Sequence, residues 1–178
     1  MRTVLAGGRR DVLNAISSAV SALWTGHVEK DKLELAHADN DPSFVSGAWA
    51  GTGVLQMEDK ITSCQGVIMR FSGSPGSYNF AGASLNCGDT NQDFPPSTAY
   101  DIRQDGQVYF REVHVGHIES DRIHIGNPVA IANKMSDDYT VIRRSDILLF
   151  TEAMGLPAAT PWFSFVAIMK KTQNPTEH

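Results

Sequence analysis

The chain has 178 residues, a length that fits one domain, and its 42% hydrophobic and 20% charged residues are ordinary for a folded protein. The formal net charge is −5 and no cluster of Lys and Arg is larger than a pair, so the sequence argues against nucleic-acid binding, which normally uses a basic surface. No stretch of about 18 apolar residues occurs, so we expect no membrane-spanning segment.

Residues 1–40 are predicted to form a helical arm. Between residues 11 and 24 the apolar side chains recur at the i, i+3, i+4 spacing of one helix face. Asp11 is suitable as an N-cap, and Gly26 follows the last apolar residue. The apolar face of such a helix needs a partner, either an end of the main domain or another chain. A homo-oligomer formed through this helix is therefore one expectation.

The same N-terminal segment does not have the composition of a secretory signal peptide. Arg9, Arg10 and Asp11 interrupt the apolar stretch that a leader needs, and the residues that follow are interspersed with Asn and Ser. We therefore expect a cytoplasmic protein as the sequence is written, and an exported one if a leader has been lost.

From Ser46 onward the pattern is typical of β-strands. Short runs rich in Val, Ile, Phe, Tyr and Thr recur about every 8–12 residues, and Gly, Pro, Asn and Asp mark the turns between them. Short connections favour an up-and-down meander, and closure of the sheet removes its exposed edges. We predict an all-β, antiparallel up-and-down β-barrel of about 8–10 strands over residues 41–173. A short tail follows at residues 174–178.

A turn at Pro75-Gly76 predicts the first hairpin. Phe71 then faces Phe80, Gly73 faces Tyr78 and Met69 faces Gly82, and this apolar face is expected inside the barrel. Ala83 falls on the outer face in this register. The ligand-contacting residues predicted from this hairpin are Met69, Phe71 and Phe80.

The same register places Cys64 opposite Cys87. Directly paired strand residues lie within disulfide range, so an oxidising compartment would allow a bridge between them. In a reducing cytosol the two would be buried thiols instead. The sequence leaves both states open.

A turn at Asp105-Gly106 predicts another hairpin. Tyr100, Ile102, Tyr109, Arg111 and Val113 then share the more apolar face, which we expect inside. Arg111 would lie beside Tyr100, and the two could hold the carboxylate of an amphipathic ligand. Tyr109, on the same face, is a further predicted ligand-binding residue. Two alternatives remain: the other face points inward, or Arg111 lies at the barrel mouth in water.

A third turn, at Ser120-Asp121, places His117 opposite His124 and Ile118 opposite Ile123. Two imidazoles are fewer than the three or four ligands that zinc requires, and the isoleucines should be buried, so we predict a surface histidine pair. The chain has no P-loop, dinucleotide fingerprint or Gly-x-Ser-x-Gly motif. We predict no metal site, no cofactor and no nameable catalytic residue.

The segment around Gly47-x-Trp49 resembles the start of lipocalins and related calycins, in which Gly-x-Trp begins the first strand. The resemblance implies that Trp49 closes the base of the barrel beneath a basic residue from near the end of the chain, here Lys170 or Lys171. Gly47 and Trp49 are thus expected to be structural residues, as are the two cysteines. The motif covers about ten residues, and the strand rhythm covers residues 46–171.

Three functions are compatible with this architecture. The first is a binding protein that holds a small hydrophobic or amphipathic molecule inside the barrel. The second is an enzyme on the same scaffold, of the isomerase or cyclase type, acting on a lipid-like substrate. The third is an interaction or assembly protein with a filled barrel. A binding protein predicts an apolar cavity with one or two polar anchors, whereas an enzyme predicts several ionisable groups converging inside.

Overall fold

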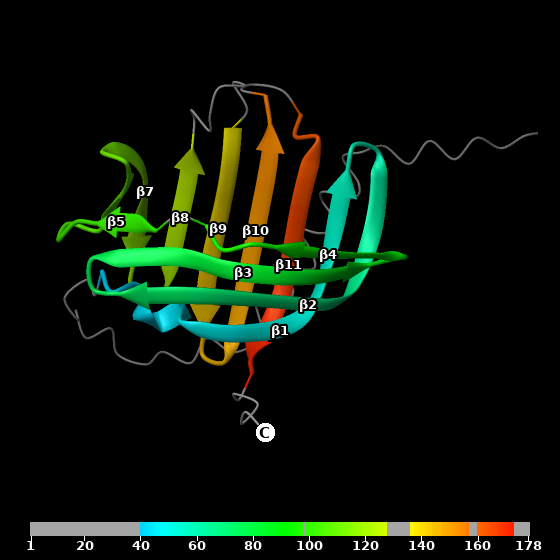
Figure 1. Ribbon diagram of the computed structural model, residues 1–178, viewed down its shortest axis with the longest axis horizontal. Helices are drawn as coiled ribbons and strands as arrows, with labels where there is room; N and C mark the ends of the chain where they lie inside the picture. The colour runs from blue at the N-terminus through cyan, green and yellow to red at the C-terminus, as the bar shows by residue number, and fades with distance from the viewer. Residues whose placement is uncertain (1–39, 98, 128–135, 157–159, 173–178) are drawn as a thin grey trace, which may run out of the picture. The chain divides into compact units, whose positions relative to one another are not determined.

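A computed structural model describes residues 40–97, 99–127, 136–156 and 160–172 of the chain (Figure 1). These residues belong to one compact unit, His37–His178. The predicted helix at residues 11–24 and the tail at 174–178 lie outside the described residues, so the helical arm and the homo-oligomer expected from it stay predictions. Within the described ranges no helix has the length and hydropathy needed to cross a bilayer.

The described residues form an all-β fold, in which eleven strands follow one short 3₁₀ helix (Pro42–Val45). In chain order the strands are β1 (Gly47–Met57), β2 (Lys60–Ser74), β3 (Ser77–Cys87), β4 (Thr90–Phe94), β5 (Tyr100–Ile102), β6 (Gln107–Phe110), β7 (Val113–Glu119), β8 (Arg122–Asn127), β9 (Ser136–Arg144), β10 (Ile147–Gly155) and β11 (Phe163–Lys171).

The strands form a single antiparallel sheet that closes into a ring. Its order is β2-β1-β11-β10-β9-β8-β7-β6-β5-β3-β4, and an additional pairing between β2 and β3 completes the ring. Figure 1 shows β1, β2 and β3 running across β8 to β11, so the two parts of the sheet face each other. The prediction of an all-β, up-and-down antiparallel sheet that closes on itself is confirmed, but the described residues contain eleven strands instead of the predicted 8–10.

One edge of β3 is shared by two short strands. Its C-terminal half, from Ala83 to Cys87, pairs with β4, whereas Ser77 and Tyr78 at its start pair with β5. Between β4 and β5 lies Pro95-Pro96, and proline cannot donate a ladder hydrogen bond. The pairing is therefore interrupted here.

Trp49 on β1 lies fully buried at one end of the ring. Its Nε1 donates to the carbonyl of Val45 at 2.7 Å. Two cations lie 5.8 Å from the centre of its ring: Lys171, from the end of the last strand, and Arg143 of β9. Gly47 has φ +117° and a Cβ there would lie 3.1 Å from the Lys171 side chain, so glycine suits the close approach. The basic residue expected over Trp49 is thus present, with a second one beside it.

The β2–β3 hairpin follows the predicted register only at its ends. Phe71 faces Phe80 as expected, but Met69 faces Ala83 instead of Gly82. The difference arises because each strand carries one extra residue, Ala81 on β3 and Gln65 on β2, and the two irregularities cancel. Ala83, predicted to point outward, is consequently buried in the core.

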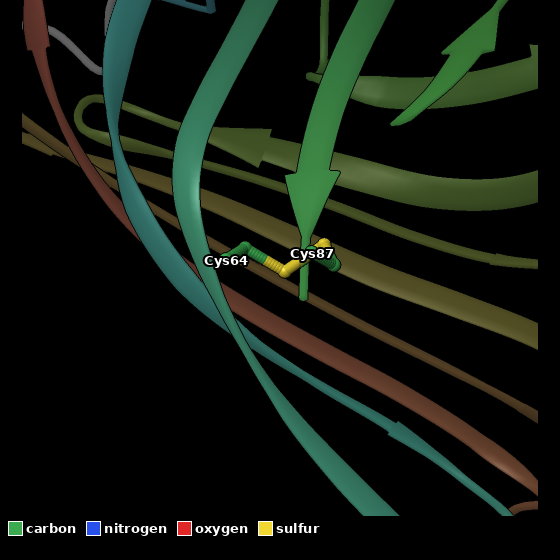
Figure 2. Close-up of a disulfide and its surroundings, with 2 residues drawn as sticks. All are labelled: Cys64 and Cys87. Atoms are coloured by element: carbon green, nitrogen blue, oxygen red, sulfur yellow. A yellow bond between two sulfur atoms is a disulfide. The ribbon is translucent and has the colours of Figure 1, made fainter. Parts of the chain in front are cut away.

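Beyond the second irregularity the two cysteines face each other, as the sequence predicted. Cys64 of β2 and Cys87 of β3 form a disulfide, which Figure 2 shows between the two strands. Both side chains belong to the core. Of the two redox states that the sequence allowed, the structure contains the bridge.

The predicted hairpin at Asp105-Gly106 is wrong by one residue. Asp101 pairs with Tyr109 and Ile102 with Val108, so Arg111 does not lie opposite Tyr100. The chain turns again directly after β6, where Arg111 and Glu112 adopt φ values of 47° and 67°. A two-residue turn with positive φ at both positions joins antiparallel strands tightly, which ends β6 at Phe110.

Loss of the disulfide should destabilise the barrel. The bridge joins residues 23 apart, and the chain-entropy account of such a loop gives about 3 kcal/mol. We expect the double variant Cys64→Ala/Cys87→Ala to lose about this much free energy of unfolding in urea titrations. A reducing agent should destabilise the native chain similarly and leave the double variant unchanged; equal stability of both chains would contradict the structural role.

Candidate functional site

The interior of the ring contains a cavity of about 150 Å³. Its walls are mainly apolar and come from both faces of the ring: Met69, Phe80, Ala83, Leu85, Phe94, Phe150, Met154, Phe163 and Phe165. Five polar side chains also line it: Ser97, Tyr100, Asp137, Tyr139 and Glu152. The cavity therefore combines largely aromatic walls with a set of five polar side chains.

Three of the predicted ligand-binding residues line this cavity, namely Met69, Phe80 and Tyr100. Phe71 is buried against Phe80, with 5.9 Å between ring centres, and does not belong to the lining.

The other two predicted residues lie elsewhere. The hydroxyl of Tyr109 donates to Gln107 Oε1 at 2.9 Å, and the Arg103 guanidinium lies 3.5 Å from the centre of its ring. Arg111 is exposed on the β6–β7 turn. Its predicted contact with a ligand carboxylate stays a prediction, and it is not part of the cavity lining.

Asp137 of β9 and Glu152 of β10 form the acidic part of the cavity. Alternation along β9 places Asp137 on the same face as the buried Tyr139 and Val141. On β10 the same rule places Glu152 with Phe150 and Met154. Tyr139 and Glu152 are direct cross-strand partners, so Asp137 lies diagonally from Glu152.

Burial changes the protonation of this carboxyl pair. Desolvation is the largest cause that raises the pKa of Glu152, from 4.5 to about 8, and the neighbouring charge of Asp137 and the hydrogen bond between the two carboxyls add to it. The pKa of Asp137 is also raised, first by desolvation and then by the charge of Asp138. At neutral pH Glu152 is therefore mainly protonated, beside a second carboxyl whose pKa is also raised.

Three tyrosines adjoin the carboxyl pair. Tyr78 of β3 and Tyr100 of β5 are cross-strand partners with ring centres 6.1 Å apart, and Tyr139 approaches from β9. Burial raises the pKa of all three phenols, so they stay neutral. Tyr78 is fully buried and Tyr139 is 7% exposed.

Several of these buried polar atoms lack a hydrogen-bond partner. Among the described residues, the Oδ1 atom of Asp137 is buried without one, and the Oη atoms of Tyr78 and Tyr139 are buried near each other but outside good hydrogen-bond geometry. Leaving such groups unpaired costs roughly 1–3 kcal/mol each. The cavity therefore presents hydrogen-bonding capacity that a bound molecule or water would satisfy.

A second hollow of about 460 Å³ lies beside the disulfide, between the β1–β2 turn and β4. Its lining is more polar and includes Lys60, Asp89 and Cys87. Leu85 lines both this hollow and the interior cavity, so a single side chain borders the two spaces.

The histidine pair lies on the outer surface, as predicted. His117 faces His124 with ring centres 5.3 Å apart, while Ile118 and Ile123 on the reverse face are buried. His124 Nε2 lies 3.1 Å from Asp138 Oδ2. In the part of the chain that the structure describes, no group of three or more His, Cys, Asp or Glu side chains is arranged to hold a metal ion.

Sequence reasoning did not find Asp137 and Glu152. The run Ser136-Asp137-Asp138 has the composition of a turn, whereas it begins β9. The sequence nevertheless contained a signal. If the chain turns at Ser145-Asp146, each carboxyl lies an even number of residues from the large apolar side chains of its own strand and therefore on the same, inward face.

Comparison with known proteins assigns the chain to no family. No protein-family profile matches its sequence, and no curated protein matches it significantly.

The buried carboxyl should make stability depend on pH. An unfolded Glu152 releases its proton near 4.5, whereas the folded one holds it to about 8, so the folded state binds more protons between these values. The stabilisation that the folded state gains from holding this proton is therefore complete below pH 4.5 and is lost as the pH rises through 8. We expect Glu152→Gln to remove a decrease of about 5 kcal/mol in the free energy of unfolding across this range.

Urea titrations at several pH values measure this effect. The matched control is Glu58→Gln, which changes an exposed carboxyl on the β1–β2 turn and should keep the native pH dependence. Parallel profiles for the native chain and Glu152→Gln would contradict the assignment.

Proposed function

We propose that the protein is a lipocalin-like barrel that binds a small, mainly apolar molecule carrying one polar group. The observation that carries the proposal is the interior cavity, in which apolar walls surround buried polar atoms that have no partner among the described residues. Ligand sites generally combine an apolar lining with a few polar groups that fix orientation.

The volume limits the size of the ligand. A cavity of about 150 Å³ accommodates one benzene-sized ring. Such a ring would contact Phe150, Phe163 and Phe165 of β10 and β11, and the polar substituent would reach Asp137 and Glu152. A long-chain lipid would require the cavity to open further.

The comparison with lipocalins draws support from the buried Trp49 at the start of the first strand. Lys171, from the end of the last strand, lies over its ring, which is the arrangement that the family resemblance implies. Barrels of this kind are wide enough to hold one small ligand.

Benzyl alcohol is a suitable probe, because it has one ring and one neutral polar group. We expect binding with a Kd on the order of 0.1–1 mM by calorimetry, since ligands of this size gain a limited free energy. Ala83→Leu should weaken binding at least about tenfold, because the added methyl groups occupy the cavity.

Ala153→Leu is the matched control. Ala153 lies between the cavity-lining Glu152 and Met154 on β10 and points to the outside, so the same added volume should leave binding unchanged. Thermal unfolding of both variants verifies that they fold. Equal affinities of the two variants, or no binding by the native chain, would refute an interior site.

Acid–base catalysis on the bound molecule is a second candidate function. The observation in its favour is the convergence of two carboxyls with different proton affinities, Asp137 and Glu152, on one cavity. Such a pair can remove a proton from carbon with one member and return it with the other, which is the chemistry of an isomerase. Incorporation of deuterium from heavy water into a bound ligand, lost in Glu152→Gln and Asp137→Asn, would support this function.

A further inference from the structure

We infer that the cavity selects a small organic amine, bound as its cation, with the ammonium group against Asp137 and Glu152 and the apolar part against the aromatic walls. This inference rests on the proposed function and names the class of ligand. It differs from the expectation drawn from Arg111, which favoured a carboxylate ligand.

The charges that face the polar end of the cavity are all acidic or neutral. Asp137 and Tyr139 approach Glu152 from β9, Tyr100 approaches from β5, and the β11 residue opposite Glu152 is Phe165. Among the residues that the structure describes, no Lys, Arg or His belongs to the cavity lining. A carboxylate or phosphate ligand would meet like charge here, whereas a cation would meet its counter-ion.

The unpartnered atoms suit a hydrogen-bond donor. Asp137 Oδ1 is a pure acceptor when ionised, and the Oη atoms of Tyr78 and Tyr139 can accept as well as donate. An ammonium group has three N–H donors and no acceptor, so it suits the carboxyl oxygens of Asp137 and Glu152, which line the cavity. Tyr139 lines the cavity beside these carboxyls and is 7% exposed.

The aromatic side chains favour the same ligand. Phe80, Phe150 and Phe163 line the cavity together with Tyr100. Their faces attract a cation within about 6 Å, and the attraction increases when the cation is desolvated. The walls would therefore bind the ring of the ligand without repelling its charged group.

Binding of the cation should release a proton. In the free site Glu152 is mainly protonated at neutral pH. A bound ammonium lowers the pKa of this carboxyl, so Glu152 ionises and its proton passes to solvent. No bond forms or breaks other than the O–H bond of Glu152, and the site exchanges one proton for one organic cation.

Benzylamine and benzyl alcohol test the inference, because they differ only in the polar group. We expect benzylamine to bind at least about tenfold more tightly near neutral pH. Calorimetry in two buffers of different ionisation enthalpy should report release of about one proton for the amine and none for the alcohol. Glu152→Gln should bind the amine without proton release, and Glu58→Gln should behave as the native chain.

The outcomes separate this inference from the proposed function. If both probes bind with equal affinity and no proton is released, the site is a general apolar cavity and the amine inference is wrong, while the proposed function stands. If neither probe binds to the native, folded chain, both are wrong. Tighter binding of the amine that survives Asp137→Asn and Glu152→Gln unchanged would place the amine outside this cavity and overturn the inference.

Discussion

Closure of the sheet into a ring is the constraint on which the rest of the structure depends. Long pairings join β1, β2, β3, β9, β10 and β11, whereas β5 completes the ring with only two residue pairs on each side. Strand alternation then sends every second side chain into one enclosed space. Tyr78 and Tyr100 pair at the β3–β5 junction, so two of the three phenols lie where the ring has the fewest paired residues.

The enclosed space combines two opposing physical requirements. Most of its side chains are aromatic or aliphatic and stabilise the barrel through burial. Asp137 and Glu152 have the opposite effect on stability, because folding removes water from both carboxyls. As a result, Glu152 keeps its proton at neutral pH. Groups that destabilise a core are typical of functional sites, where the free energy lost in folding is recovered when a ligand supplies the missing partners.

Local rules predicted those parts of the fold that short turns determine. The Cys64–Cys87 and His117–His124 pairings both followed from a turn and the period of two along a strand. The strand irregularities did not, because nothing in the local sequence marks Ala81 as an extra residue. The acidic pair was missed for a different reason: strands β3, β5, β9 and β10 assemble the site across the ring, and inward polar residues oppose the pattern by which strand faces are assigned.

The central prediction is that Glu152 keeps its proton at neutral pH inside the apolar ring of strands. Its most direct test is an NMR titration of the side-chain carboxyl carbons in the uniformly ¹³C-labelled protein, with Glu152→Gln used to assign the resonance. The resonance of Glu152 should titrate with a pKa of about 8. A pKa near the ordinary value of 4.5 would show a solvated carboxylate and contradict the buried pair, and with it the polar cavity.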